Sequence, residues 1–216
     1  GDCGACSVAL LEANARGEAT WRAVNACIAL LPMFAGREVV TVEGLAALPP
    51  GGGAPSEGEL HPVQAAMVEH YGSQCGYCTP GFVMSMFEAY YRSDVETRAQ
   101  LSDQLVDALA RKPAAPDLFQ IRLAAPRAPL AACDVGDGQQ RFVRPTTAAE
   151  VVRLLAEHPE ARIVAGATEI GVELNKKLAA FPFLVSTEAV AELRAITKTD
   201  AAWEIGGAAT LTELEE

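Results

Sequence analysis

The spacing of hydrophobic and polar residues divides the sequence into three parts of different character. Residues 1–49 are rich in small and β-branched residues, and short stretches of them bounded by turn residues predict strands. The predicted strands are Ser7–Leu11, Thr20–Val24 and Arg37–Val42. Residues 57–112 carry apolar residues three and four positions apart, which predicts helices. From residue 141 onward, strand-like and helix-like stretches take turns, as they do in βαβ units.

The boundaries between these parts are rich in residues that interrupt regular structure. A run of proline, glycine and serine at 49–56 follows the first part, and residues 113–140 hold many alanines and prolines with little periodicity. We therefore predict a linker over 113–140. The helices predicted between the two boundaries begin at Pro62, Pro80 and Glu96, and the last two end near Tyr91 and Arg111. The histidines, His61, His70 and His158, lie at predicted helix ends and are expected to cap helices or face solvent.

The last part of the sequence, residues 141–216, predicts an α/β domain. Thr146 or Thr147 is expected to cap a helix that ends near Glu157. A buried strand over 161–165 is followed by a glycine-bounded loop and a further helix. More strands are predicted at Phe183–Ser186 and Trp203–Gly206. A sheet of this type needs more strands than these, so the domain is expected to continue beyond residue 216.

Composition and charge narrow the class of protein. The 216 residues are 50% hydrophobic and 21% charged, which is ordinary for a globular protein with one to three domains. The formal net charge of −11 argues against binding to nucleic acid or to an anionic membrane through a broad basic surface. The sequence has no apolar run long enough to span a membrane and no signal peptide, so we expect a cytoplasmic protein without a membrane partner.

Six cysteines supply the candidate chemistry, and four of them form two close pairs. The cysteines are Cys3, Cys6, Cys27, Cys75, Cys78 and Cys133. Without a secretory signal, such pairs indicate metal or redox chemistry more than structural disulfides. The pair in Gln-Cys-Gly-Tyr-Cys-Thr-Pro-Gly, residues 74–81, precedes a predicted helix for which Thr79 is the expected N-cap and Pro80 the first residue. The positive end of that helix favours thiolates over thiols. Cys133 lies in the predicted linker, where a free structural thiol is the simplest interpretation.

Three kinds of site remain possible for the paired cysteines. A zinc ribbon also uses two C-x-x-C pairs, but its pairs are closer in sequence than Cys6 and Cys75 are. A thioredoxin-like disulfide usually follows a buried strand, whereas a helix is predicted before Cys75. Plant-type [2Fe–2S] sites follow the pattern C-x4-C-x2-C with a distant fourth cysteine. Cys3, Cys6 and Cys27 match the last three positions of that pattern, and the first would fall just before Gly1. Glycines such as Gly1 and Gly4 let a backbone wrap closely around a cluster.

Taken together, these motifs resemble the xanthine dehydrogenase family of molybdenum hydroxylases. The resemblance rests on residues 1–8, on Asn-Ala-Cys at 25–27, on residues 74–81, and on Pro-Thr-Thr-Ala-Ala-Glu through Ile-Val-Ala-Gly-Ala-Thr-Glu-Ile-Gly-Val-Glu at 145–173. The three parts also occur in the family's order. The likeness covers nearly the whole chain and is greatest to the small iron–sulfur and FAD subunit of bacterial members.

The resemblance implies an α+β fold with several domains. A partial β-grasp, ferredoxin-like [2Fe–2S] domain would span 1–49, a helical-bundle [2Fe–2S] domain 57–112, and the first part of an α/β FAD-binding domain 141–216. The first cluster would be held by Cys3, Cys6 and Cys27, and the second by Cys75 and Cys78. Gln74 matches a residue that contacts the pterin in the family. The loop whose backbone amides hold the FAD pyrophosphate would comprise Ile163, Val164, Ala165, Gly166, Ala167, Thr168, Glu169 and Ile170. A loop before a helix suits an anion, although an ordinary βα turn would look the same.

The resemblance also implies a role in a larger enzyme. Molybdopterin on a separate large subunit would oxidise a purine, hypoxanthine or xanthine, to urate. Two [2Fe–2S] clusters would relay the electrons to FAD and NAD, and no catalytic residue would lie on this chain. Two small and two large subunits would form a heterotetramer. A relative that oxidises aldehydes, nicotinate or carbon monoxide, and a zinc or thiol-redox module of another class, are the alternatives.

One motif of the family is absent. The second cluster requires two further cysteines in Cys-Arg-Cys-Thr-Gly-Tyr, but the sequence near 103–113 reads Asp-Gln-Leu-Val-Asp-Ala-Leu-Ala-Arg-Lys-Pro. Either residues of the natural chain are missing from this sequence, or the protein lacks a second cluster. The first interpretation predicts a chain break between Leu105 and Pro113, with neighbouring Cα atoms well beyond ~3.8 Å.

Overall fold

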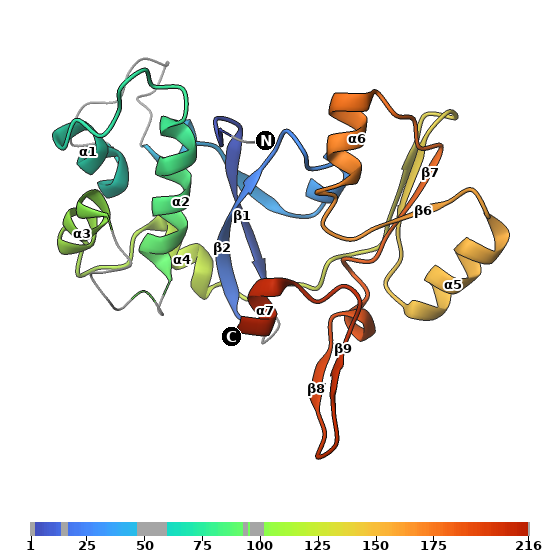
Figure 1. Cartoon of the computed structure of the whole chain (residues 1–216). Coiled ribbons are helices and arrows are strands. Elements are labelled where there is room, and N and C mark those ends of the chain that lie inside the picture. Colours follow the sequence, from blue (N-terminus) through green and yellow to red (C-terminus); the bar gives the residue numbers. More distant parts are fainter. Residues whose placement is uncertain (1–2, 14–16, 47–59, 93–94, 96–101, 216) are drawn as a thin grey trace. The chain divides into compact units, whose positions relative to one another are not determined.

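The computed structural model describes residues 3–13, 17–46, 60–92, 95 and 102–215, and the chain divides into two compact units. The first unit comprises Gly1–Glu12, Ala19–Cys27 and Glu38–Pro126. The second comprises Ala13–Glu18, Ile28–Arg37 and Arg127–Glu216. Figure 1 shows the elements of both units.

The first unit begins with a three-stranded sheet in the order β2-β1-β3. Its strands are β1 (Ser7–Ala13), β2 (Ala19–Asn25) and β3 (Glu38–Val40), close to the three strands predicted from the sequence. β3 runs antiparallel to β1, with Ala9 opposite Val40. A short 3-10 helix, η2 (Glu43–Leu45), follows. Alternate residues of these strands point inward, and Ala9, Val40 and Trp21 are buried in one core.

Four helices complete the first unit, and α2 lies at its centre (Figure 1). They are α1 (Pro62–Glu69), α2 (Thr79–Tyr91), α3 (Asp103–Ala110) and α4 (Leu118–Ala124). Trp21 joins the sheet to these helices, because its ring packs edge-on against Phe87 of α2 and Phe119 of α4. The indole nitrogen also donates to the Phe119 carbonyl, and the Ala23 N–H of β2 donates to Glu88 of α2 at 2.8 Å. The sheet and the helices therefore share one core.

Two details of this helical region differ from the sequence prediction. Helix α2 begins at Thr79, so Cys78 is its N-cap and Thr79 instead shares a hydrogen bond with Ser73 at 2.7 Å. Helix α3 begins at Asp103, where Ser102 caps it by accepting from the Leu105 N–H, while residues 96–101 of the predicted helix lie outside the described residues. α3 runs without interruption from Asp103 to Ala110, and the break expected between Leu105 and Pro113 stays a prediction.

The stretch predicted as a linker, 113–140, carries two regular elements. Helix α4 starts with a capping box in which Asp117 accepts from the Gln120 N–H and Gln120 accepts from the Asp117 N–H. Its 7 residues, about two turns, are too few for a clear hydrophobic period, and the burial of Phe119 stabilises the helix. Strand β4 (Cys133–Gly136) pairs antiparallel with the next strand of the second unit. Pairing with β5 (Arg141–Arg144) therefore forms strand β4 although the local sequence pattern is weak.

The second unit is built around a four-stranded sheet in the order β4-β5-β7-β6. β5 (Arg141–Arg144), β7 (Phe183–Ser186) and β6 (Arg162–Val164) are parallel, as the βαβ pattern predicts. Helix α5 (Ala148–Glu157), capped by Thr147, connects β5 to β6, and α6 (Ile170–Lys177) connects β6 to β7. The remaining elements are η1 (Leu31–Phe34), η5 (Ala191–Leu193), β8 (Ile196–Lys198), β9 (Trp203–Ile205) and α7 (Leu211–Glu215).

The two faces of this sheet are covered by different parts of the chain. Successive residues of β5 and β7 point to opposite faces, so Val143 and Val185 pack with α5, whereas Phe142 and Leu184 do not. The second face is covered by the loop before α6 and by Met33, which comes from far earlier in the sequence. Within the described residues, no helix is both long and apolar enough to cross a membrane.

His61 caps α1, as predicted, and its side chain is buried. Its Nδ1 accepts from the Val63 N–H, and its Nε2 lies 2.9 Å from the Tyr91 hydroxyl, which donates to Asp117 at 2.6 Å. Burial lowers the pKa of His61 from 6.5 to about 4, and the Asp117 carboxylate opposes that shift. His70 and His158 lie at the C-terminal ends of α1 and α5.

The buried His61 predicts a loss of stability in mild acid. Between pH 6.5 and 4 the unfolded chain binds a proton at this histidine and the folded chain does not, so falling pH favours unfolding. A shift of this size corresponds to about 3 kcal/mol of unfolding free energy. Between pH 6.5 and 4, the unfolding free energy of His61→Gln should fall by about 3 kcal/mol less than that of the wild type. Urea unfolding at several pH values would measure this difference.

The control is His70→Gln, which changes the partly exposed histidine at the other end of the same helix. This variant should keep the acid sensitivity of the wild type. An identical pH dependence in His61→Gln would show that His61 is not the group responsible.

Candidate functional site

The first cysteine loop is shaped by neighbouring ends of β1 and β2. Gly4 has a positive φ of 70° and its carbonyl accepts from the Ser7 N–H, which forms a tight turn before β1. The Ala26 N–H then donates to the Cys6 carbonyl, so the residues after β2 lie beside this turn. As a result the Cys27 N–H donates to the Cys6 sulfur at 3.4 Å.

Two of the three predicted ligands in this loop are therefore brought together. Cys6 and Cys27 are neighbours, whereas Cys3 is exposed, and the described residues contain no group of three or more potential ligands close enough to hold a metal ion. The interaction with Cys6 lowers the pKa of the Cys27 thiol, which favours the thiolate. An N–H aimed at a sulfur is the kind of contact that tunes thiolate ligands.

The second cysteine loop leads directly into α2. Gly76 has a positive φ of 83°, and its carbonyl accepts from the Thr79 N–H, so the chain turns between the two thiols. Cys75, Cys78 and the neighbouring Gln74 are all exposed. Their position at the start of a 13-residue helix places the thiols in the positive field of its N-terminus.

The two cysteine loops touch each other through a pair of glycines. A Cβ on Gly81 would lie 2.8 Å from the Gly4 carbonyl oxygen and 2.9 Å from its Cα. No side chain could occupy this space without moving the backbone. Gly81, in the first turn of α2, thus lets the loop of Cys3 and Cys6 approach the loop of Cys75 and Cys78.

The second loop offers only two thiols. Helices α3 and α4, which pack in the same unit, contain no cysteine, and Cys133 belongs to β4 of the other unit. A [2Fe–2S] cluster that is held by cysteines alone needs four thiolates. The donors present at Cys75 and Cys78 are half of such a set.

The predicted flavin loop lies between β6 and α6 in the second unit. Val164 and Ala167 are buried in the core, whereas Ala165, Gly166, Thr168 and Glu169 are exposed. Ala167 has a positive φ of 58°, an uncommon conformation for alanine, and its carbonyl accepts from the Gly171 N–H as α6 begins. The residues at 163–170 therefore form a bent, anchored turn.

The outer side of this loop has the properties of an anion cradle. A Cβ added at Gly166 would meet no atom within 4 Å, so the protein leaves the space above this glycine open. Among the described residues, no acceptor receives a backbone hydrogen bond from residues 166–169. Open space, unused N–H groups and a following helix fit a pyrophosphate.

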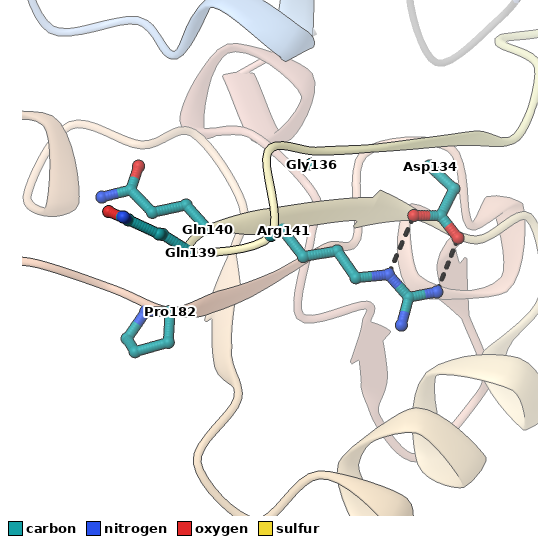
Figure 2. A pocket seen from close by; sticks show the side chains of 7 residues that line it. Asp134, Gly136, Gln139, Gln140, Arg141 and Pro182 are labelled. Carbon is teal, nitrogen blue, oxygen red and sulfur yellow. Dashed lines mark hydrogen bonds and ion pairs between the residues drawn. The ribbon is translucent and has the colours of Figure 1, made fainter.

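Two cavities among the described residues lie away from the predicted sites. A cavity of about 330 Å³ at the β4–β5 turn is lined by residues that include Asp134, Arg141 and Pro182, and Figure 2 shows Arg141 paired with Asp134 beside it. A second, of about 610 Å³, lies along α4. Neither is lined by a residue predicted for a site.

Sequence reasoning missed the part of the chain that lies under the flavin loop. Residues Ile28–Arg37 belong to the second unit, and Met33 packs with Val164 and Ala167. The signal in the sequence was the charged residue Arg144, directly after the apolar pair Phe142–Val143. In the structure the Arg144 side chain is fully buried. A charge inside a buried strand requires partners, and these partners lie on the missed segment.

Comparison with known proteins agrees with the order of these sites. Residues 41–116 match a family described as a [2Fe-2S] binding domain, and residues 138–216 match the FAD binding domain in molybdopterin dehydrogenase. Over its whole length the chain is 27% identical to xanthine dehydrogenase of Drosophila subobscura. It is 26% identical to xanthine dehydrogenase 1 of Arabidopsis thaliana over 99% of its length, and 26% identical to xanthine dehydrogenase/oxidase of Rattus norvegicus over its whole length.

The chain spans about a fifth of the length of these relatives, at 20%, 21% and 20%. The alignment with the Drosophila protein runs over 278 positions, although the chain has 216 residues. The relative therefore has segments without a counterpart in this sequence.

The glycine contact between the cysteine loops predicts a specific sensitivity to a methyl group. Gly81→Ala places a Cβ against the Gly4 backbone and should destabilise the protein by about 1–3 kcal/mol. Thermal unfolding followed by circular dichroism would measure this. Gly207→Ala, at a glycine whose Cβ meets nothing within 4 Å, should leave the midpoint nearly unchanged. Equal midpoints for the two variants would contradict the contact.

Proposed function

We propose that the chain belongs to the xanthine dehydrogenase family of molybdenum hydroxylases and is the iron–sulfur and flavin electron-transfer part of such an enzyme. It contains a [2Fe–2S] domain and an FAD domain. The observation that carries the proposal is the placement of Cys27 against Cys6 in one unit and of an open anion cradle in the other. No catalytic group is assigned to this chain.

The first cluster site is proposed at Cys3, Cys6 and Cys27. Neighbouring strand ends bring Cys6 and Cys27 together, the lowered pKa of Cys27 favours a ligating thiolate, and Gly4 lets the loop bend closely. A [2Fe–2S] cluster bound there supplies one-electron transfer. The protein's own contribution is to hold the thiolates, to direct an N–H at sulfur and to keep the loop close to α2. A fourth ligand would have to come from outside this sequence.

The proposed second site at Cys75 and Cys78 holds half of a ligand set. We therefore assign these residues the role of ligands only together with two thiolates that this sequence does not contain, and we route no step through them. Gln74 is exposed beside Cys75, and we assign it a contact with a group outside this chain. In our proposal that group is the pterin of a molybdenum domain.

The flavin site is proposed at the loop 163–170. Its exposed N–H groups and the open space at Gly166 would bind the pyrophosphate of FAD, and the start of α6 adds a favourable dipole. FAD bound there supplies the step between one-electron and two-electron chemistry. The buried residues Val164 and Ala167 pack the loop against the core of the sheet.

The substrate and partners follow from the relatives and remain proposals. Because the relatives reported above are named xanthine dehydrogenases, we favour xanthine and hypoxanthine over aldehydes, nicotinate or carbon monoxide. Molybdopterin would belong to a large partner subunit in a heterotetramer, and NAD would accept the electrons. The six free cysteines suit the reducing cytoplasm.

One prediction of the proposed function concerns the iron content of the protein. We expect Cys27→Ser to remove about two irons per chain and one [2Fe–2S] signal from the EPR spectrum of the dithionite-reduced protein, because it deletes a ligand of the first site. Cys133→Ser, which changes a cysteine of the other unit, should keep both. Unchanged iron in Cys27→Ser would refute the first site.

Cys75→Ser measures the second site separately in the same assay. A further loss of about two irons would show that this pair holds a cluster with ligands from outside this sequence. Unchanged iron would show that the pair holds none.

Another prediction of the proposed function concerns the FAD content of the protein. Gly166→Val fills the open space of the cradle without meeting a protein atom at its Cβ, so it should lower FAD content by at least about ten-fold while the thermal midpoint stays within a few degrees. Gly207→Val is the control at a second open glycine outside the loop. Full FAD occupancy in Gly166→Val would place the flavin elsewhere.

A further inference from the structure

The predicted flavin loop leaves the sheet of the second unit at the edge where three parallel strands end. β5 ends at Arg144, β7 at Ser186 and β6 at Val164, and parallel pairing places these carboxyl ends at one edge. Open α/β sheets bind their ligands at this edge. Just beyond β7, the Thr187 N–H donates to the Val164 carbonyl at 2.9 Å, so the residues after β7 are tied to the strand from which the loop starts.

Charged side chains are buried at the same edge. Arg144 is only 2% exposed and pairs with Glu188 at 3.1 Å, and the other carboxylate oxygen of Glu188 accepts from Arg37 at 2.6 Å. All three belong to the second unit, and the exposures of Glu188 and Arg37 are 9% and 10%. Buried ion pairs must regain the cost of desolvation through close and well-directed contacts, so the geometry of this network is strict.

Arg144 also holds the backbone of the segment that contains Arg37. Its guanidinium donates to the Ala35 carbonyl at 2.7 Å and to the Met33 carbonyl at 3.4 Å. The Met33 side chain is buried together with Ala167 of the flavin loop. The arginine therefore fixes the residue on which the loop packs.

The loop needs this support because one of its residues has an unfavourable backbone conformation. Ala167 has a φ of 58°, which costs energy in alanine, and its burial against Met33 offsets that cost. The Gly171 N–H, in the first turn of α6, donates to the Ala167 carbonyl at 2.7 Å. A Cβ on Gly171 would lie 2.7 Å from the carbonyl carbon of Ile28, so the backbone of the same segment also lies against the helix that follows the loop.

We propose that Arg144 is a positioning residue for FAD: together with Glu188 it holds residues 28–37 beneath the loop 163–170 and so keeps the loop in the conformation that binds the pyrophosphate. This inference rests on the proposed function. Arg144 is buried, so it acts through Met33 and Ala167 and not by contact with the ligand. Without its donors the loop would have to be ordered when FAD binds, and that ordering lowers affinity.

The first comparison is between Arg144→Met and Arg141→Met in the whole protein, purified with the chains that accompany it. Both arginines lie on β5 and both pair with a carboxylate, but Arg141 is exposed beside Asp134 (Figure 2). Methionine keeps most of the volume and removes the charge and the donors. Glu188 keeps its pair with Arg37 in Arg144→Met, which limits the loss of stability.

A second comparison separates positioning from stability. Met33→Ala and Leu154→Ala each shorten a buried side chain of the second unit, Met33 in the cluster under the loop and Leu154 on the sheet face that α5 covers. Both truncations should lower the thermal midpoint, because each leaves a cavity in the core. Only Met33 supports the loop, so only Met33→Ala should change the binding of FAD.

The readouts are the affinity of the flavin-free protein for FAD, measured by the quenching of flavin fluorescence, and amide hydrogen exchange at residues 163–170. We expect Arg144→Met and Met33→Ala to bind FAD at least about ten-fold more weakly and to exchange in the loop about ten-fold faster than the wild type. Arg141→Met and Leu154→Ala should match the wild type in both measurements. If Arg144→Met does not fold, Glu188→Gln takes its place, because it keeps the shape of the carboxylate and removes its charge.

Wild-type affinity for FAD in Arg144→Met would overturn the inference and leave the proposed flavin site in place. An equal loss of affinity in Leu154→Ala would also overturn it, because general destabilisation would then be sufficient. Weaker binding without faster exchange at 163–170 would show that Arg144 does not act through the loop. A wild-type protein that binds no FAD would refute the proposed function itself, and this inference with it.

Discussion

A buried guanidinium at the end of a parallel strand constrains the second unit. Arg144 is nearly inaccessible, so each of its donors needs an acceptor that the sheet itself does not provide. The acceptors are carbonyls of Met33, Ala35 and Ala131 together with the Glu188 carboxylate. Because these groups come from three distant parts of the sequence, satisfying one side chain fixes the sheet, the segment 28–37 and the strand that precedes β5 in one arrangement.

In the same arrangement, Met33 packs beneath the predicted flavin loop. One sheet face is covered by a helix that follows the usual βαβ order, but the other depends on Met33. With Met33 in place, Val164 and Ala167 are buried, while Ala165, Gly166, Thr168 and Glu169 of the loop are exposed. The positive φ of Ala167 costs energy, and burial of this residue stabilises it. The anion cradle is therefore a product of packing as much as of the glycine it contains.

In the first unit the corresponding constraint is close backbone approach. Trp21 fixes the sheet against α2 and α4, and Gly81 then lets the two cysteine loops meet. The neighbouring strand ends place the Cys27 N–H on the sulfur of Cys6. Cys75 and Cys78 are exposed at the start of α2, and α3 and α4 supply no further thiol. Fold and ligand set are thus separable features: the helical domain forms around its aromatic core without a complete set of cysteines.

By itself the sequence determined the features that depend on local chemistry. Strand-forming composition and helical spacing placed β1, β2, α1, α2, α5 and β7 near their observed bounds, and the two cysteine motifs together with residues 145–173 carried the family resemblance. Short elements escaped this reasoning, since α4 and β4 are held by Phe119 burial and by pairing with β5 and have little period of their own. Only the tertiary structure decided that Ile28–Arg37 joins the second unit, that His61 is buried, and that Gly171 and Arg144 hold the segment after Cys27. The physical reason is that a buried charge and a backbone contact are satisfied by residues far apart in sequence, and no local pattern records which residues those are.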